Sequence, residues 1–378
     1  MSSQLRSVTL LALRLGFTAF GGPAAHIAML RHEVVERQAW LSNQRFLDLM
    51  GITNLIPGPN STEMVMHVGQ ERAGRKGLLA AGAAFILPAA SITLVFAWLY
   101  VEYGTTSTGE SMLTGIKPVT LAVILQAVWT LGRTSAKSAV LAVVSVLVGF
   151  LYLLGINELV LLFGGALLAF AVNRIQAMPS SLSLIGPGAL GTATTWLATT
   201  DPAVPYSGWR LFLAFLKIGS LLYGSGYVLV AFLQSEFVDR LGWITEQQLL
   251  DAVAVGQFTP GPVFTTATFV GYLAGGFSGA AIATVAIFLP AFVFVAIAHH
   301  WINRLLGIAW VRPLLDGINA AAIGLMGAVA IVLARDAVVN WWTAILAVAA
   351  LALLIRFRVN SALLIVGGAL IGIASTAG

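Results

Sequence analysis

Long apolar segments follow one another along the whole chain, and they decide its class of fold. Of the 378 residues, 58% are hydrophobic and 9% are charged, whereas soluble domains have about 25% charged residues. Many segments reach the roughly 17 to 25 residues that a helix needs to cross the hydrocarbon core of a bilayer. Solid apolar runs favour helices over the alternating segments of a membrane barrel. We therefore expect an all-α polytopic membrane protein surrounded by a lipid bilayer.

The composition also excludes several other functions. The net charge is +5, but the cations lie in short segments between apolar runs, where they orient a membrane protein. Nucleic acid is therefore not an expected partner. The chain has no cysteine, which excludes disulfides and thiolate metal sites. Its first residues lack a small-residue cleavage pattern, so we expect no cleavable signal peptide.

The sequence contains an internal repeat. The segment from Leu30 to Pro59 aligns with the segment from Leu233 to Pro262 at an offset of 203 residues. Identical pairs in this alignment are Glu33 and Glu236, Arg37 and Arg240, Trp40 and Trp243, Gln44 and Gln247, and Asp48 and Asp251. The repeat predicts two homologous halves, residues 1–175 and 205–378. Residues 176–204 are rich in Pro, Gly, Ser and Thr and are expected to be a linker.

The cations predict how the two halves are oriented. We expect about five crossing helices in each half, near 5–24, 78–100, 112–132, 139–154 and 158–173, and near 208–232, 280–300, 313–333, 341–355 and 361–377. The segments 44–70 and 247–273 are expected to be broken re-entrant hairpins. Thirteen Lys and Arg residues then lie in cytoplasmic stretches and three on the opposite side, namely Arg6, Arg240 and Arg335. An odd number of crossings makes the repeats inverted. The rival arrangement has hairpins that cross fully and gives two parallel six-helix halves.

Each half carries a Pro-Gly-Pro break, "NLIPGPNST" in the first and "QFTPGPVFT" in the second. Proline ends a helix and glycine permits backbone conformations that other residues avoid. Backbone freed at membrane depth has to be buried in protein or line a cavity. The start of the next helix offers free N–H groups and a positive dipole end to an anion. The candidate substrate-binding residues are Asn54, Pro57, Gly58, Pro59, Asn60, Ser61, Thr62, Gln257, Thr259, Pro260, Gly261, Pro262, Thr265 and Thr266. The alternative is that both breaks are kinks needed only for packing.

Other polar residues at membrane depth extend this candidate site. Arg14 and Lys217 occupy equivalent positions and are candidate counter-ions for an anion, unless they extend to the headgroups. His26, Glu63 and His67 are candidates for proton coupling, because imidazole titrates near neutrality and Glu63 and His67 share a helix face. Structural roles are the alternative. The charged residues around Glu33 and Glu236 either lock the rims of the two halves or anchor helix ends.

Enzyme motifs are weak in this chain, and we expect no enzyme, cofactor or metal. "HEVVE", which begins at His32, has a carboxylate where the zinc motif H-E-x-x-H has its second histidine. "LYGSGY" does not match the hydrolase motif G-x-S-x-G. The chain also has no Walker A segment, so active transport has to draw on an ion or substrate gradient.

Both copies resemble the signature regions of the chromate ion transporter (CHR) family. The matching residues are "FTAFGGPAAHIAMLRHEVVERQAWLSNQRFLDLMGITNLIPGPNSTEM" in the first half and "VGQFTPGPVFTTATFVGYLAGG" in the second. The resemblance covers nearly the whole chain and is to the long, two-domain form. It implies multi-pass insertion in the bacterial inner membrane and gradient-driven chromate export that confers chromate resistance. Sulfate exchange and proton coupling are both proposed for the family.

The family motifs imply a further set of residues. In the first half they are Phe20, Gly21, Gly22, Pro23 and His26, then Trp40, Asn54 and the break. In the second half they are Gly224, Gly226, Trp243, Gln257, Thr259 and the second break. We expect the FGGP residues and the corresponding Gly224 and Gly226 to form a helix break or hinge. Leu229 stands opposite His26, which puts equal contributions of the two halves in doubt.

These observations lead to a gradient-driven exporter of a tetrahedral dianion. The helix starts at Asn60 and Val263 are expected to face one cavity. Chromate is the substrate that the resemblance implies, and sulfate has nearly the same shape and charge. A transporter of sulfate or another oxyanion and a passive anion channel are the alternatives, and a metalloenzyme would need zinc at His32. A homodimer is the assembly that we consider.

Overall fold

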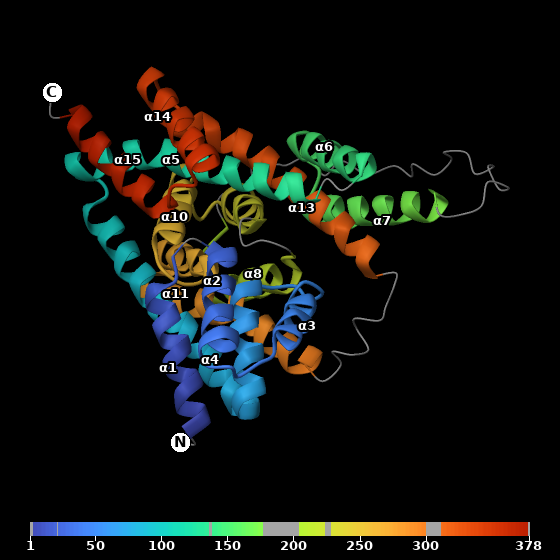
Figure 1. Cartoon of the computed structure of the whole chain (residues 1–378). Helices are drawn as coiled ribbons and strands as arrows, with labels where there is room; N and C mark the ends of the chain where they lie inside the picture. Colours follow the sequence, from blue (N-terminus) through green and yellow to red (C-terminus); the bar gives the residue numbers. More distant parts are fainter. Residues whose placement is uncertain are drawn as a thin grey trace.

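The described residues fold into helices and contain no strand. The computed structural model describes residues 3–20, 22–135, 138–176, 204–223, 228–299 and 311–376. The expected linker at 176–204 lies almost wholly outside these residues. Figure 1 shows the first four helices packed together in the lower part of the view, with α5, α6, α7, α13, α14 and α15 above them.

The helices of the two halves follow in the same order. The first half has α1 (Ser3–Thr18), α2 (Gly22–Arg31), η1 (His32–Arg37), α3 (Asn43–Thr53), α4 (Asn60–Tyr103), α5 (Ser107–Ser135), α6 (Ala139–Leu153) and α7 (Glu158–Gln176). The second half has α8 (Gly208–Leu221), α9 (Leu229–Leu233), η3 (Gln234–Arg240), α10 (Glu246–Phe258), η4 (Val263–Thr265), α11 (Thr266–Ala298), α13 (Val311–Ala337), α14 (Trp341–Ala352), η6 (Leu353–Phe357) and α15 (Ser361–Thr376).

Local details also recur between the halves. Ser42 caps α3 by accepting a hydrogen bond from the Arg45 N–H, and Thr245, which aligns with Ser42, caps α10 through a capping box with Gln248. The segments η1 and η3 are both π-helical and occupy equivalent places. Equivalent sequence therefore gives equivalent local structure in the two halves.

The long helices α4 and α11 each reverse direction at a pair of residues. Gly74 has φ 64° and ψ −156°, and Gly276 has φ 63° and ψ −150°, a conformation that is essentially open to glycine alone. The segments before and after each reversal touch at glycines, because Gly69 lies against Gly77 and Gly271 lies against Gly279. A Cβ on any of these glycines would overlap the opposing backbone. Small residues allow this approach of two helical segments. Each label therefore covers two antiparallel segments, as the blue and teal parts of α4 show in Figure 1.

The expected first crossings, 5–24 and 208–232, are wrong as single helices. Helix α1 ends at Thr18 and α2 begins at Gly22, while α8 ends at Leu221 and α9 begins at Leu229. Arg14 of α1 contacts Glu33 of η1, so the chain turns back on itself between them. Gly22, with φ 77°, supplies the conformation that this turn needs. Because each expected first crossing is interrupted by a break between two helices, the count of crossings no longer decides whether the repeats are inverted.

Four helices of the described chain are long and apolar enough to cross a membrane: Asn60–Tyr103, Ser107–Arg133, Val263–Ala298 and Pro313–Ala337. Shorter apolar helices lie at Ala139–Leu153, Glu158–Val172, Trp341–Phe357 and Ser361–Ser375. Apolar side chains on these shorter helices face outward, among them Val146, Val348 and Leu363. A soluble protein rarely exposes so much apolar surface, so these faces are suited to lipid.

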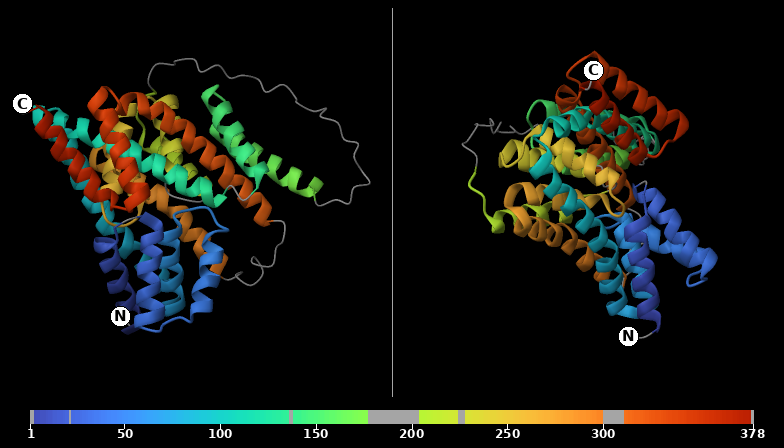
Figure 2. Two further views of the ribbon diagram at one scale, coloured as in Figure 1. Left: turned by 45° about the horizontal axis from the view of Figure 1, so that its top comes forward. Right: turned by 90° about the vertical axis from the view of Figure 1, so that its left-hand side faces the viewer.

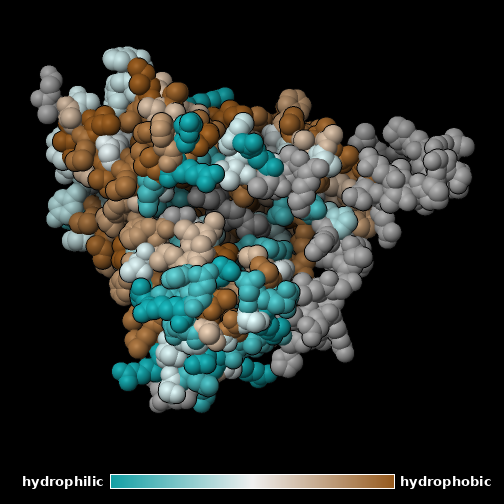
Figure 3. All heavy atoms as spheres, in the orientation of Figure 1, coloured by the Kyte–Doolittle hydropathy of each residue, from teal (hydrophilic) through white to brown (hydrophobic). Residues whose placement is uncertain are grey.

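The surface of the molecule is divided by polarity. Figure 3 shows apolar side chains over the upper left of the view, where Figure 1 places α5, α14 and α15. Hydrophilic side chains gather below, over α2 and α3. The views in Figure 2 show that α1 to α3 form a group on one side of the molecule, separate from the upper helices.

Candidate functional site

Each Pro-Gly-Pro break lies at the tip of a helical hairpin. Helix α3 and the first segment of α4 run antiparallel, because Arg45 near the start of α3 pairs with Glu71 beyond the break. Pro59 is the N-cap of α4, which begins at Asn60 as the sequence predicts. In the second half α10 ends at Phe258, Thr259 follows as its C-cap, and the chain resumes at Val263 as a single 3-10 turn before α11. The prolines of each break thus determine where the helix before it ends and where the helix after it begins.

The two tips contact the other half in a reciprocal way. The Gly58 N–H donates to the Leu222 carbonyl at 2.8 Å, and the Gly261 N–H donates to the Ala19 carbonyl at 2.9 Å. Leu222 and Ala19 are equivalent positions, 203 residues apart. A Cβ on Gly58 would lie 3.6 Å from Ala291, and a Cβ on Gly261 would lie 2.7 Å from Ala89, the equivalent alanine. Reciprocal contacts of this kind are the mark of a two-fold relation.

The first break has polar groups around it, some exposed and some buried. The Asn60 amide donates to the Asn54 side-chain oxygen at 3.0 Å and so spans the break. The His26 Nδ1 lies 3.4 Å from the Ser61 hydroxyl. Among the described residues, the Thr62 hydroxyl and both Glu63 carboxyl oxygens are buried and have no hydrogen-bond partner. Because buried polar groups are normally paired, these unpaired groups are suited to a ligand, a proton or water.

The Glu63 carboxyl lies directly over the first break. A Cβ on Gly58 would overlap its Oε1 and come within 3.1 Å of its Cδ. The expected pairing of Glu63 with His67 is not seen, because His67 Nδ1 contacts His299 Nδ1 at 3.2 Å instead. His299 also lies 3.7 Å from Glu71. The two residues share a helix face, but tertiary packing gives His67 a different neighbour.

Threonines dominate the second break. Thr265 donates to the Pro262 carbonyl at 2.9 Å and Thr266 to the Val263 carbonyl at 2.8 Å, so both hydroxyl protons are used within the turn. Thr259 is buried. The amide nitrogen of Gln257 is buried without a partner. Pro260, Gly261 and Pro262 are also buried, so this break is closed off from the surface.

The expected counter-ions are paired with protein carboxylates. Arg14 contacts Glu33 at 3.1 Å, and Lys217 pairs with the equivalent Glu236. Arg37 and Arg240 bind the same two carboxylates. The cations therefore belong to two equivalent charged clusters, each formed within one half of the chain.

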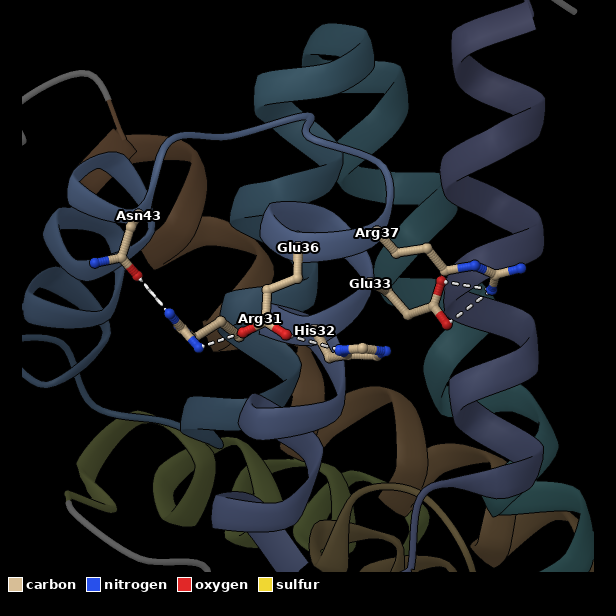
Figure 4. Close-up of polar contacts among 6 residues, drawn as sticks. All are labelled: Arg31, His32, Glu33, Glu36, Arg37 and Asn43. Carbon is tan, nitrogen blue, oxygen red and sulfur yellow. Dashed lines mark hydrogen bonds and ion pairs between the residues drawn. The ribbon is translucent and has the colours of Figure 1, made fainter.

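The polar face of α2 and η1 carries a second network, shown in Figure 4. Arg31 donates to Glu36 at 2.6 Å and to Asn43 at 2.8 Å, and it thereby ties η1 to the start of α3. His32 contacts Glu36 at 2.8 Å, and this hydrogen bond lowers the pKa of Glu36 below its usual value. His32 is therefore part of a surface network. Among the described residues no group of three His, Cys, Asp or Glu side chains could hold a metal ion.

The expected hinge residues are only partly described. Phe20 lies in the turn after α1 and is 39% exposed, and Gly22 and Pro23 open α2. Gly21, Gly224 and Gly226 lie outside the described residues.

Sequence reasoning missed three residues that join the two halves. Thr93 of α4 donates to Thr259 at 3.4 Å and to Thr265 at 3.3 Å, and it joins the first half to the second break. The signal available in the sequence was the hydroxyl of Thr93 within an otherwise apolar helix. Tyr100 and Asp251 form a hydrogen bond of 3.0 Å across the halves. Asp251 was visible only as an identical pair in the repeat, which gave no indication of its burial.

A model of a known protein family matches each half of the chain. The family model described as chromate transporter matches residues 6–170 and again residues 209–373. This chain belongs to the chromate transporter family. A chromate transport protein of Pseudomonas aeruginosa is 33% identical over 332 residues, covering 85% of this chain and 79% of its own. The chromate transport protein of Cupriavidus metallidurans is 30% identical over 381 residues, covering 98% and 92%.

A more distant member of the chromate transporter family, a probable chromate transport protein of Synechococcus elongatus, is 27% identical over 350 residues. Its match covers 88% of this chain and 85% of its own. No solved structure matches the chain. Membership identifies a transporter family and agrees with the expectation that the chain is not an enzyme.

Proposed function

We propose that this protein exports chromate from the bacterial cytoplasm across the inner membrane, driven by a gradient, and so confers chromate resistance. Family membership supports chromate as the transported ion. The observation that supports the mechanism is the reciprocal contact of the two Pro-Gly-Pro tips, each of which donates a backbone N–H to the other half. A substrate bound between such tips would be enclosed by both halves at once.

The chemistry at the tips suits an oxyanion. Thr62 and Gln257 each offer a buried polar group without a partner. The helix that starts at Asn60 adds its positive dipole end and free N–H groups. Sulfate has nearly the same size and charge as chromate, so the same groups would accept it, either as a competitor or as the exchanged ion. His26, Glu63 and His67 remain proposed sites for proton coupling.

The membrane potential alone can drive such export. Moving one elementary charge through 100 mV corresponds to about 2.3 kcal/mol. A dianion leaving an inside-negative cell therefore gains roughly 4.6 kcal/mol per 100 mV, twice the single-charge value. No nucleotide is needed for this step.

We propose inverted repeats with re-entrant hairpins. The support for this arrangement is that each break donates a backbone N–H to the other half and that α4 packs against α11. The cysteine-free chain allows a direct test. Gln44 and Gln247 are equivalent and both exposed, one at the base of each hairpin. In intact cells, a membrane-impermeant thiol reagent should label Gln247→Cys but not Gln44→Cys. Labelling of both or neither from one side would support parallel halves.

A homodimer stays a prediction that mass measurement of the purified protein can check.

The central experiment measures chromate uptake into inverted membrane vesicles, with sulfate as competitor. Removing a hydrogen bond to a charged ligand costs about 1.5–3 kcal/mol, or roughly a 10- to 100-fold loss of affinity. We expect this loss for Thr62→Val and Gln257→Leu, with chromate KM raised. Thr120→Val is the matched control, because its buried hydroxyl bonds to the Ile116 carbonyl of its own helix at 3.1 Å. Wild-type KM in both site variants would refute the proposed site. Flux that only runs downhill and shows no coupling would favour a channel.

A further inference from the structure

A polar cavity lies apart from both breaks. It has a volume of about 530 Å³ and lies between the end of α4, α5, α10 and the end of α13. Its lining includes Tyr100, Lys117, Gln247, Asp251 and Asp336. None of the residues at the Pro-Gly-Pro breaks lines it. The cavity is therefore spatially separate from the proposed substrate site.

Asp251 is the buried end of this cavity. Its side chain is 2% exposed, and the Tyr100 hydroxyl donates to its Oδ2 at 3.0 Å. Its Oδ1 is buried and has no hydrogen-bond partner in the part of the chain that the structure describes. A carboxyl with one oxygen held by a neutral donor and the other open can bind one more proton without moving any neighbour.

The charges around the cavity favour a cation over an anion. Glu110 and Asp336 line it together with Asp251, while Lys117 is the basic residue of the lining. Three carboxyl groups against one ammonium raise the local concentration of cations. A substrate dianion is therefore a poor match for this space.

The other elements packed against α10 do not change the excess of carboxyl groups around the cavity. Helix α15 has no titratable side chain, and α11 contributes Leu273 to the lining. In η3, Glu236 is bound by Lys217 and Arg240, and Asp239 accepts from Gln234. Arg335 adjoins Asp336 in the last turn of α13.

A proton is the cation that fits the donors present. The described residues include no group of three His, Cys, Asp or Glu side chains for a metal ion, whereas a proton needs a single oxygen. We propose that Asp251 is a proton-binding site reached through this cavity, and that it supplies the proton coupled to transport. The proton passes from cavity water to Oδ1, Tyr100 keeps its own proton, and the carboxyl becomes neutral.

The position of Asp251 connects the site to the second break. Helix α10 runs from Glu246 to Phe258 and leads directly into Thr259 and Pro260. Asp251 lies eight residues before Thr259, about two turns along the same helix. A change of charge in α10 can therefore alter how the helix packs against α4 and α5, and through it the second tip.

The repeat provides a matched control. Asp48 is equivalent to Asp251 but is partly exposed and accepts a hydrogen bond from Gln44 at 2.9 Å. The first half therefore has the same residue in a solvated setting. If the proton site is Asp251, the Asp251→Asn variant will lose proton binding and the Asp48→Asn variant will keep it. In other properties the two variants should resemble each other.

The first test needs no substrate. Infrared spectra of the purified full-length protein are recorded as the pH is varied. We expect a component of the protonated-carboxyl band that titrates in the wild type and in Asp48→Asn and is missing from Asp251→Asn, whereas any band from the buried Glu63 carboxyl is common to all three proteins. Tyr100→Phe, which keeps the carboxyl but removes its donor, should retain the band at a shifted frequency. A wild type without such a band, or an Asp251→Asn variant that keeps it, would overturn the proposal.

The second test rests on the proposed transport function. In proteoliposomes, chromate flux of the wild type and of Asp48→Asn should change at least fivefold with pH on the cavity side, and flux of Asp251→Asn by less than twofold. Flux of Asp251→Asn that keeps the full pH dependence would refute coupling through this residue. Replacing sodium with a large organic cation should leave wild-type flux unchanged, and a loss would instead identify a sodium site. A titrating band without any chromate flux would contradict the proposed function while leaving the proton site in place.

Discussion

Replacing Gly261 with alanine tests how closely the second break packs against the first half. Gly261 has φ +87°, and its N–H donates to the Ala19 carbonyl at 2.9 Å. An added Cβ would lie 2.7 Å from the Ala89 Cβ and 3.3 Å from the Gly16 carbonyl oxygen. Ala89 belongs to a rigid helix and its Cβ cannot turn away. The backbone of the tip therefore has to move.

The size of the effect follows from two contributions. A positive φ costs an alanine roughly 1–2 kcal/mol relative to glycine. Overpacking in a tight interior costs about 1–3 kcal/mol. The sum predicts that Gly261→Ala lowers the free energy of unfolding by roughly 2–5 kcal/mol.

Gly155 separates these contributions. It also has φ +87°, but an added Cβ would meet nothing within 4 Å. Gly155→Ala should therefore lose only the backbone contribution, about 1–2 kcal/mol. The assay is thermal unfolding of both purified variants in the same detergent at one scan rate, because membrane-protein unfolding is often irreversible. We expect Gly261→Ala to unfold at a temperature several degrees below Gly155→Ala. Equal midpoints would show that the tip does not contact Ala89 closely, and would refute the reciprocal packing.

Two further pairs of variants test the contacts between segments. Glu236→Gln leaves Lys217 and Arg240 without their shared carboxylate and should lower stability by about 1–2 kcal/mol in thermal unfolding. Glu36→Gln, on the exposed network, should leave stability nearly unchanged. An equal loss of stability in both variants would argue against the buried cluster. Thr93→Val removes the hydroxyl that joins Thr259 and Thr265, so the chromate flux should fall severalfold while the Thr120→Val control retains it. Normal flux in Thr93→Val would exclude this link from the transport mechanism.

Several features could be predicted from the sequence because their causes are local. Apolar runs, proline and glycine act through their own backbone or through contact with lipid, so the helices and the start of α4 at Asn60 follow directly. The two copies were visible for the same reason, since equivalent residues such as Ser42 and Thr245 cap equivalent helices. Family membership, which the residues of the breaks indicated, is confirmed by matches across both halves.

The tertiary structure decided what the sequence left open. The reversal between α1 and α2, the partner of His67, and the burial of Glu63 and Asp251 all depend on neighbours that are distant along the chain or set by packing. His67 illustrates the reason, because its position on a helix face was predictable but its neighbour His299 is 232 residues away. A helix period places a side chain on a face, whereas only the packing of the two halves decides what that face meets. By itself the sequence determined two helix breaks in an apolar chain, whereas the contact of each break with the opposite half depends on the fold.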